Sequence, residues 1–181
     1  SRWLNTPDNG GLQWAAFTPV FFIPVIGNVL APLAGVTIGL ESWATAQFGI
    51  GLLLWPVLQT MLLIRMVQAG PLAARLSPSI FITMVAPSII GLCFLQFDAP
   101  PSLAWGSWGI GLFCLALSLT QIHTILEQPF GLPHWAMSFP MAAFTTLSLR
   151  MSQEQGGAWL ELPATLLLAI TSLLILGLTL G

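Results

Sequence analysis

His123 and Glu127 are the two residues of this chain whose types and spacing come nearest to reactive chemistry. Four residues apart on a helix, an imidazole and a carboxylate share one face and can form an ion pair or bind a metal together. Two ligands do not make a metal site, and Glu127 stands just before Pro129, where a helix is expected to end at the wet membrane surface. The sequence also lacks His-Glu-x-x-His, the Gly-x-Ser-Gly of intramembrane serine proteases and a pair of membrane aspartates. We therefore expect no enzyme activity, no metal and no cofactor.

A second group of side chains is polar but uncharged, and it lies close to prolines inside long apolar segments. The polar residues are Asn28, Thr83, Ser88, Ser138 and Thr145, and the prolines are Pro24, Pro87 and Pro140. Amide and hydroxyl groups can line a route for weakly hydrated anions, while the lack of a carboxylate among them argues against a proton or cation pathway. Each hydroxyl can instead bond to the carbonyl three or four residues earlier in its own helix. Both interpretations stay open.

Phe139 and Arg150 lie in the same apolar segment and have different expected roles. Phe139 directly precedes Pro140 near the expected middle of the membrane. A bulky apolar ring there can close a narrow pore by steric block and dewetting, and ordinary packing is the alternative. Arg150 ends the segment, where it can meet incoming anions or simply anchor the helix at the membrane surface.

Long apolar helices must position these residues, and the chain consists almost entirely of such helices. Six stretches contain no Asp, Glu, Lys or Arg: Asn9–Leu40, Ser42–Ile64, Leu76–Phe97, Ala99–Leu126, Gln128–Leu149 and Leu162–Gly181. Each is about as long as the ~20 residues that cross a bilayer. Of the 181 residues, 56% are hydrophobic and 6% are charged, which leaves too few polar groups to cover a soluble domain. The sequence therefore predicts an all-α polytopic membrane protein embedded in the lipid bilayer.

We expect six transmembrane helices in a single domain, residues 1–181. Their ranges are 14–39, 43–67, 78–97, 103–126, 133–150 and 160–180. Short joins with turn-forming residues imply three antiparallel helical hairpins. The first helix of each hairpin carries an interior proline, which deletes a backbone hydrogen bond and costs about 3 kcal/mol unless a neighbour satisfies the freed carbonyl. The pattern predicts proline-kinked inner helices around an axis and straighter outer helices facing lipid; the alternative is that prolines are simply common in membrane helices.

The few charged residues indicate an orientation rather than a charged partner. Four Lys and Arg against six Asp and Glu give a net charge of −2, with no basic patch for nucleic acid. Arg2, Arg65 and Arg75 fall on one side of the predicted bundle and Arg150 on the other. Because basic residues favour the cytoplasmic side, both ends of this chain are expected in the cytoplasm.

Three segments of the chain resemble the tellurite-resistance/C4-dicarboxylate transporter family, which includes bacterial TehA proteins, fungal malate and sulfite transporters and plant slow anion channels. The most specific is Trp135-Ala136-Met137-Ser138-Phe139-Pro140-Met141, and the others are the proline-containing segments 18–35 and 78–87. The resemblance implies ten helices in five hairpins around a pore, and a homotrimer with one pore in each subunit. It also implies that Phe139 occludes the pore as its gate. These six helices would match the last three hairpins, so we expect that four N-terminal helices are absent, and we expect a bacterial inner membrane location.

The first functional hypothesis is a channel or transporter that passes small anions or C4-dicarboxylates through a central pore gated by Phe139. The alternative is a membrane subunit or scaffold that transports nothing and packs partner helices through motifs such as Gly35-x-x-x-Gly39. A third hypothesis, a membrane enzyme using His123 and Glu127, would need a bound metal. Anion flux in liposomes without any partner protein distinguishes the first hypothesis from the second.

Overall fold

The computed structural model describes residues 16–154 and 158–180, and every regular element in that part of the chain is a helix. With η for a 3-10 helix, the elements are η3 (Pro19–Phe22), α1 (Ile23–Gly35), α2 (Glu41–Ala69), η4 (Ala74–Met84), α3 (Val85–Gln96), α4 (Pro101–Leu119), α5 (Ile122–Leu126), η5 (Leu132–Met137), α6 (Ser138–Glu154) and α7 (Ala158–Leu180). The chain is an all-helical membrane protein with several candidate spans, as predicted. The expected helix start at residue 14 and the side chain of Arg2 lie outside the described residues.

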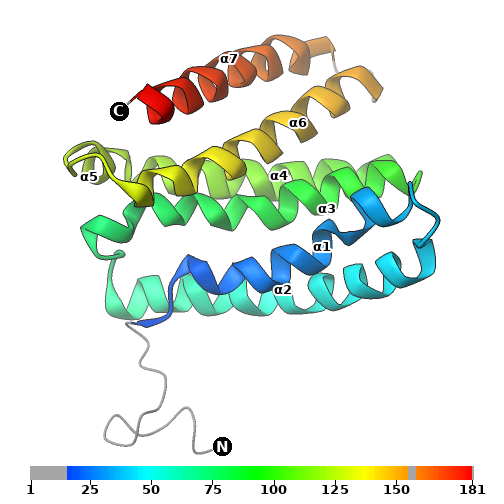
Figure 1. The fold of residues 1–181 in the computed structure, drawn as a ribbon, viewed down its shortest axis with the longest axis horizontal. Helices are drawn as coiled ribbons and strands as arrows, with labels where there is room; N and C mark the ends of the chain where they lie inside the picture. The colour runs from blue at the N-terminus through cyan, green and yellow to red at the C-terminus, as the bar shows by residue number, and fades with distance from the viewer. Residues whose placement is uncertain (1–15, 155–157, 181) are drawn as a thin grey trace, which may run out of the picture.

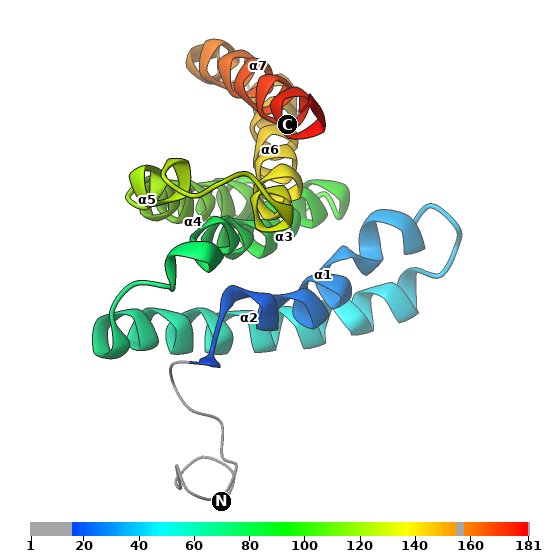
Figure 2. The ribbon, with the colours of Figure 1, turned by 60° about the vertical axis from the view of Figure 1, so that its left-hand side comes forward.

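The long helices are arranged as three pairs that follow one another across the molecule (Figure 1). Helix α1 packs along α2, α3 along α4, and α6 along α7, while α3 also contacts both α1 and α6. The turns inside the α1–α2 and α3–α4 pairs lie at one end of the bundle, and the connections between pairs lie at the other (Figure 1). Figure 2 shows the same order from a second side, with α2 and α7 farthest apart and α3 between them. Helix α3 is therefore the central element of the bundle.

Burial distinguishes the central segment from the helices at the edges. In its most apolar window, 83% of the residues of Ala74–Gln96 are buried, against 22% for Glu41–Ala69 and 17% for Trp159–Leu180. The open faces of the two edge helices carry large aliphatic residues such as Leu53 and Leu173, which are 69% and 67% exposed. Such faces suit hydrocarbon rather than water, so α2 and α7 have the character of lipid-facing helices.

Within residues 16–154 and 158–180, four helices are long and apolar enough to cross a membrane. They are Glu41–Ala69, Ala74–Gln96, Pro101–Leu119 and Trp159–Leu180. The segment Pro19–Gly35 is a shorter apolar helix, and α6 is a 17-residue helix whose last turn is polar. The first and fifth of the six expected spans are thus not among these four.

The three predicted interior prolines stand at the beginning of α-helices. Pro24 is the second residue of α1, while Pro87 and Pro140 are the third residues of α3 and α6. Each of these helices continues directly from a 3-10 segment, η3, η4 or η5. The backbone N–H groups of a first helical turn have no acceptor within the α-helix, so a proline there loses no α-helical hydrogen bond. The cost that we expected for a mid-helix proline does not arise at these positions.

Other differences concern where helices end. The fourth predicted helix is divided, because α4 ends at Leu119 and the short α5 follows after a turn at Thr120 and Gln121. The fifth continues past Arg150 to Glu154, and its last turn is polar. The first ends early, and Gly39 in the turn that follows adopts a φ of +79°, a left-handed conformation that favours glycine.

Candidate functional site

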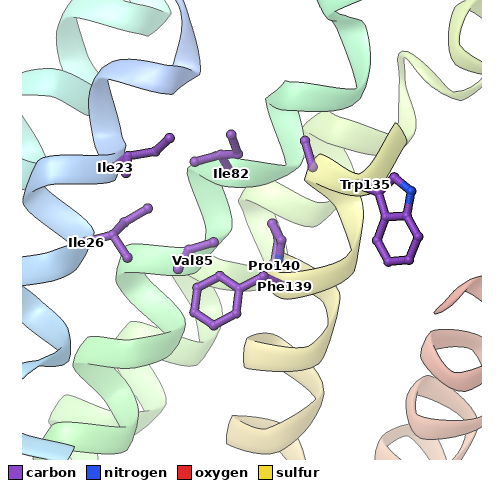
Figure 3. A pocket seen from close by; sticks show the side chains of 8 residues that line it. Ile23, Ile26, Ile82, Val85, Trp135, Phe139 and Pro140 are labelled. Carbon is purple, nitrogen blue, oxygen red and sulfur yellow. The ribbon is translucent and has the colours of Figure 1, made fainter. Parts of the chain in front are cut away.

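Helix α1, the segment η4–α3 and the segment η5–α6 meet at one pocket of about 230 Å³. It is lined by Ile23, Ile26, Ile82, Val85, Trp135, Ala136, Phe139 and Pro140 (Figure 3). The lining residues come from α1, from η4 and α3, and from η5 and α6. Each pair of helices contributes its first member to the pocket.

The pocket lies at the points where 3-10 helix changes to α-helix. Ile23 is the first residue of α1 and Val85 the first of α3, while Phe139 is the second residue of α6. A 3-10 helix turns by about 120° per residue and an α-helix by about 100°, so the direction of the side chains changes at such a junction. The three junctions present apolar side chains to a common space.

Phe139 points its aromatic ring into this space from α6, toward α1 and α3 (Figure 3). The side chain of Phe139 is 48% exposed. Val85 and Ile26 lie on the helices that the ring faces (Figure 3). No carboxylate or basic side chain of residues 16–154 and 158–180 lines the pocket. An aromatic ring against aliphatic side chains gives water few hydrogen-bonding partners, which is the composition of a hydrophobic constriction.

Two of the predicted pore-lining polar residues are partly exposed and bond to nearby carbonyls. The Nδ2 atom of Asn28 donates to the Pro24 carbonyl at 2.9 Å. The Ser138 hydroxyl donates to the Trp135 carbonyl at 2.8 Å. Both side chains thus bond to backbone carbonyls three or four residues earlier in the chain. They are close in sequence to the pocket but do not line it.

The other three polar residues are buried between helices. The hydroxyl of Thr83 donates to the Ile80 carbonyl at 2.7 Å, and that of Ser88 to the Met84 carbonyl at 2.6 Å. Thr145 Oγ1 lies 2.8 Å from Thr171 Oγ1 on α7. The structure therefore brings Phe139 and Pro140 together at the pocket, while none of the five polar residues, nor Pro24 or Pro87, lines it. Pore lining elsewhere along these helices stays a prediction.

The aliphatic lining residues were missed at the level of sequence. They are Ile23, Ile26, Ile82 and Val85, together with Ala136. A signal was present, because a large apolar residue stands one or two positions before each of the three prolines: Ile23, Val85 and Phe139. In an apolar helix these residues look like all their neighbours, so only the positions of the prolines single them out.

The charged candidates lie away from the pocket. Arg150 forms an ion pair with Glu154 at 2.7 Å, and both side chains are exposed. His123 in α5 and Glu127 just after it are exposed as well. Within the described ranges, no three His, Cys, Asp or Glu side chains gather in a group that could hold a metal ion.

Comparison with known proteins gives one family and several relatives. The family described as "Voltage-dependent anion channel" (SLAC1) matches residues 2–181. The chain is similar to the S-type anion channel SLAH2 of Arabidopsis thaliana, with 27% identity over 167 residues, which cover 89% of this chain and 32% of that protein. It is also similar to SLAH3 of the same plant (24% identity, 88% of this chain and 25% of that protein). A third relative is the uncharacterized transporter MJ0576 of Methanocaldococcus jannaschii (24% identity, 72% and 44%).

The chain spans less than half the length of each of these relatives. No solved structure matches the chain significantly.

Proposed function

Because this chain belongs to the SLAC1 family of voltage-dependent anion channels, also known as the tellurite-resistance/C4-dicarboxylate transporter family, we propose that the protein passes small anions across a membrane. The route runs between the first members of the three helix pairs, and the ring of Phe139 closes it at the pocket. The observation that carries this proposal is the convergence of the junctions η3–α1, η4–α3 and η5–α6 on one apolar space. The relatives named S-type anion channels support the class of substrate.

The chemistry of the pocket favours small, weakly hydrated anions over dicarboxylates. A hydrophobic constriction passes an ion only when water enters with it, and weakly hydrated ions lose least on entering. Recognition of a carboxylate ordinarily uses Arg or a helix N-terminus. Arg150, the basic residue nearest in sequence to Phe139, is exposed and paired with Glu154. C4-dicarboxylates are thus the second candidate substrate, and Arg150 at the end of the route would meet anions only after releasing Glu154.

The remaining parts of the proposal concern assembly and location. The outer helices α2, α4 and α7 face lipid or a neighbouring subunit, and the protein forms a homotrimer with one pore in each subunit. The protein lies in a bacterial inner membrane. The connection between α2 and η4 and both ends of the chain are on its cytoplasmic side. Arg65 and Arg75 flank that connection, and a basic flank favours the cytoplasmic side.

The test is anion flux through liposomes that contain the full-length protein and no partner. Chloride, nitrate, sulfite and malate are compared for the wild type, for Phe139→Ala and for Phe113→Ala. Phe113 is a matched control, because it is 56% exposed on α4 and lines no part of the pocket. We expect Phe139→Ala to raise nitrate and chloride flux about tenfold, since it removes the ring from the constriction, and Phe113→Ala to leave flux unchanged. Absence of flux above empty liposomes in all three proteins, with each folded, would refute transport and leave a packing subunit as the function.

A further inference from the structure

We propose that the constriction is two-sided, and that Ile23, Ile26, Ile82 and Val85 form an aliphatic wall against which the ring of Phe139 closes. This inference rests on the proposed anion transport and adds to it four residues that control flux. The wall residues come from the first two helix pairs, whereas Phe139 comes from the third. Closure would then depend on how α6 sits against α1 and α3.

The wall is stiff because of its residue types. Ile and Val are β-branched, and in a helix such side chains have one strongly preferred χ1 rotamer. Ile26 and Val85 are 7% and 1% exposed, so packing holds them as well. Phe139 is half exposed and has more room to turn. The geometry thus sets two tightly packed β-branched side chains, Ile26 and Val85, opposite a half-exposed aromatic ring.

The two sides of the pocket belong to different packed clusters. Ile26 and Val85 are part of a cluster that also contains Phe22, Val29 and Ile89, and Ile82 packs against it. Met137 and Met141, which flank Phe139 in the sequence, belong to a second cluster with Phe144. The pocket therefore lies at a seam between two hydrophobic cores. The two cores share elements, because Phe81 and Met84 of η4 belong to the second cluster and Ala143 of α6 to the first, so a shift of α6 that moves the ring from the wall also repacks both cores.

The wall predicts a specific effect of adding one hydroxyl group. Neither the Phe139 ring nor the aliphatic wall offers water a hydrogen-bonding partner, so closure of the ring on the wall would exclude water. Threonine has nearly the shape of valine but carries a hydroxyl, so Val85→Thr adds a partner for water with little change in volume. Ile23→Thr also adds a hydroxyl, although it removes the terminal methyl group from the side chain, at a position that is 56% exposed, where the risk to folding is small. Both changes should let water, and with it anions, pass the pocket while Phe139 is still in place.

The experiment measures nitrate flux through liposomes that contain full-length protein with Val85→Thr or Ile23→Thr. Val57→Thr and Ile50→Thr are the matched controls, because both positions are 51% exposed on the edge helix α2 and line no part of the pocket. We expect a rise of about fivefold for each wall variant and no change for the controls. In a Phe139→Ala background the wall changes should add little, because the closure they weaken is already lost. Flux that multiplies in the double variants would show two independent effects and overturn the two-sided closure.

The outcomes for Phe139→Ala and for the wall variants distinguish a failure of this inference from a failure of the proposed function. If Phe139→Ala raises flux and both folded wall variants match the wild type, the wall is refuted and anion transport stands. If no protein, including Phe139→Ala, carries nitrate above empty liposomes, anion transport fails and the wall with it. If Val85→Thr does not fold, the test still decides, because Ile23→Thr probes the same wall.

Discussion

Thr145 on α6 and Thr171 on α7 are buried and share a hydrogen bond, with their Oγ1 atoms 2.8 Å apart. The bond joins the two members of the third helix pair. The sequence makes Thr145 a candidate for pore lining, and in the structure its hydroxyl bonds to the outer helix α7. A hydroxyl on a membrane helix that meets a hydroxyl on the next helix fixes how the two helices face each other.

This bond predicts an unequal response to mutation. Thr145→Val leaves the Thr171 hydroxyl buried without a partner and should lower the free energy of unfolding by about 1 kcal/mol. The double variant Thr145→Val/Thr171→Val removes both hydroxyls and should be less destabilised than the sum of the two single changes. The measurement is the midpoint of unfolding by SDS in mixed micelles. Strictly additive effects would show that the two hydroxyls do not interact.

Gly111 on α4 predicts a second effect on stability. A Cβ atom at this position would lie 2.8 Å from Cε2 of Phe144 on α6, too close for two carbon atoms. Gly111→Ala must displace the ring, and overpacking of this kind costs roughly 1–3 kcal/mol. Gly109 on the same helix has open space around its Cα, so Gly109→Ala is the matched control. The control should stabilise by roughly 0.5–1 kcal/mol through higher helix propensity.

The same unfolding assay in SDS compares the two glycine variants. Opposite signs are expected, with Gly111→Ala unfolding at lower SDS than the wild type and Gly109→Ala at higher. Equal midpoints for the two variants would contradict the close approach of α4 and α6.

The proposed orientation predicts which connections a reagent can reach from outside the cell. Ala73 lies in the exposed connection between α2 and η4, and Gln153 is exposed in the last turn of α6. With the cytoplasmic side assigned by Arg65 and Arg75, a membrane-impermeant maleimide should label Gln153→Cys in intact cells. Ala73→Cys should be labelled only after the cells are lysed. Labelling of Ala73→Cys in intact cells would invert the orientation.

The sequence was sufficient to predict the class of protein, and it drew attention to two residues that line the pocket. Uncharged apolar segments of about 20 residues are typical of membrane-spanning helices, so the membrane prediction follows from the composition. Phe139 and Pro140 were identified because an aromatic residue beside a proline is conspicuous in an apolar helix, and both line the pocket.

The sequence could not show the direction of individual hydroxyls. Thr83, Ser88 and Thr145 share an apolar surrounding in the sequence, and all three are buried between helices. The rotation of a helix about its axis is set by packing against neighbours, which apolar residues on every side do not encode. The hydroxyls of Thr83 and Ser88 instead satisfy carbonyls of the preceding turn, the alternative that remained open.

The 3-10 segments were also beyond prediction. Hydropathy reports which residues are apolar but not whether a backbone N–H bonds three or four residues back. The segment Ala74–Met84 is 3-10 helix over 11 residues, although runs of more than 3–4 residues are uncommon. Its change to α-helix at Val85 places that side chain at the pocket, which no periodicity in the sequence indicates.

The most direct test of the central claim asks whether an aqueous anion route passes Phe139. In a background with Cys93→Ala and Cys114→Ala, whose native thiols are fully buried, Phe139→Cys and Phe113→Cys are compared in liposomes. A negatively charged, membrane-impermeant methanethiosulfonate is added while nitrate flux is recorded. We expect Phe139→Cys to raise flux and the reagent then to lower it about tenfold, because the adduct fills the constriction with a like charge. Flux through Phe113→Cys should not respond. A Phe139→Cys protein that carries nitrate and is unaffected by the reagent would contradict a route through this pocket.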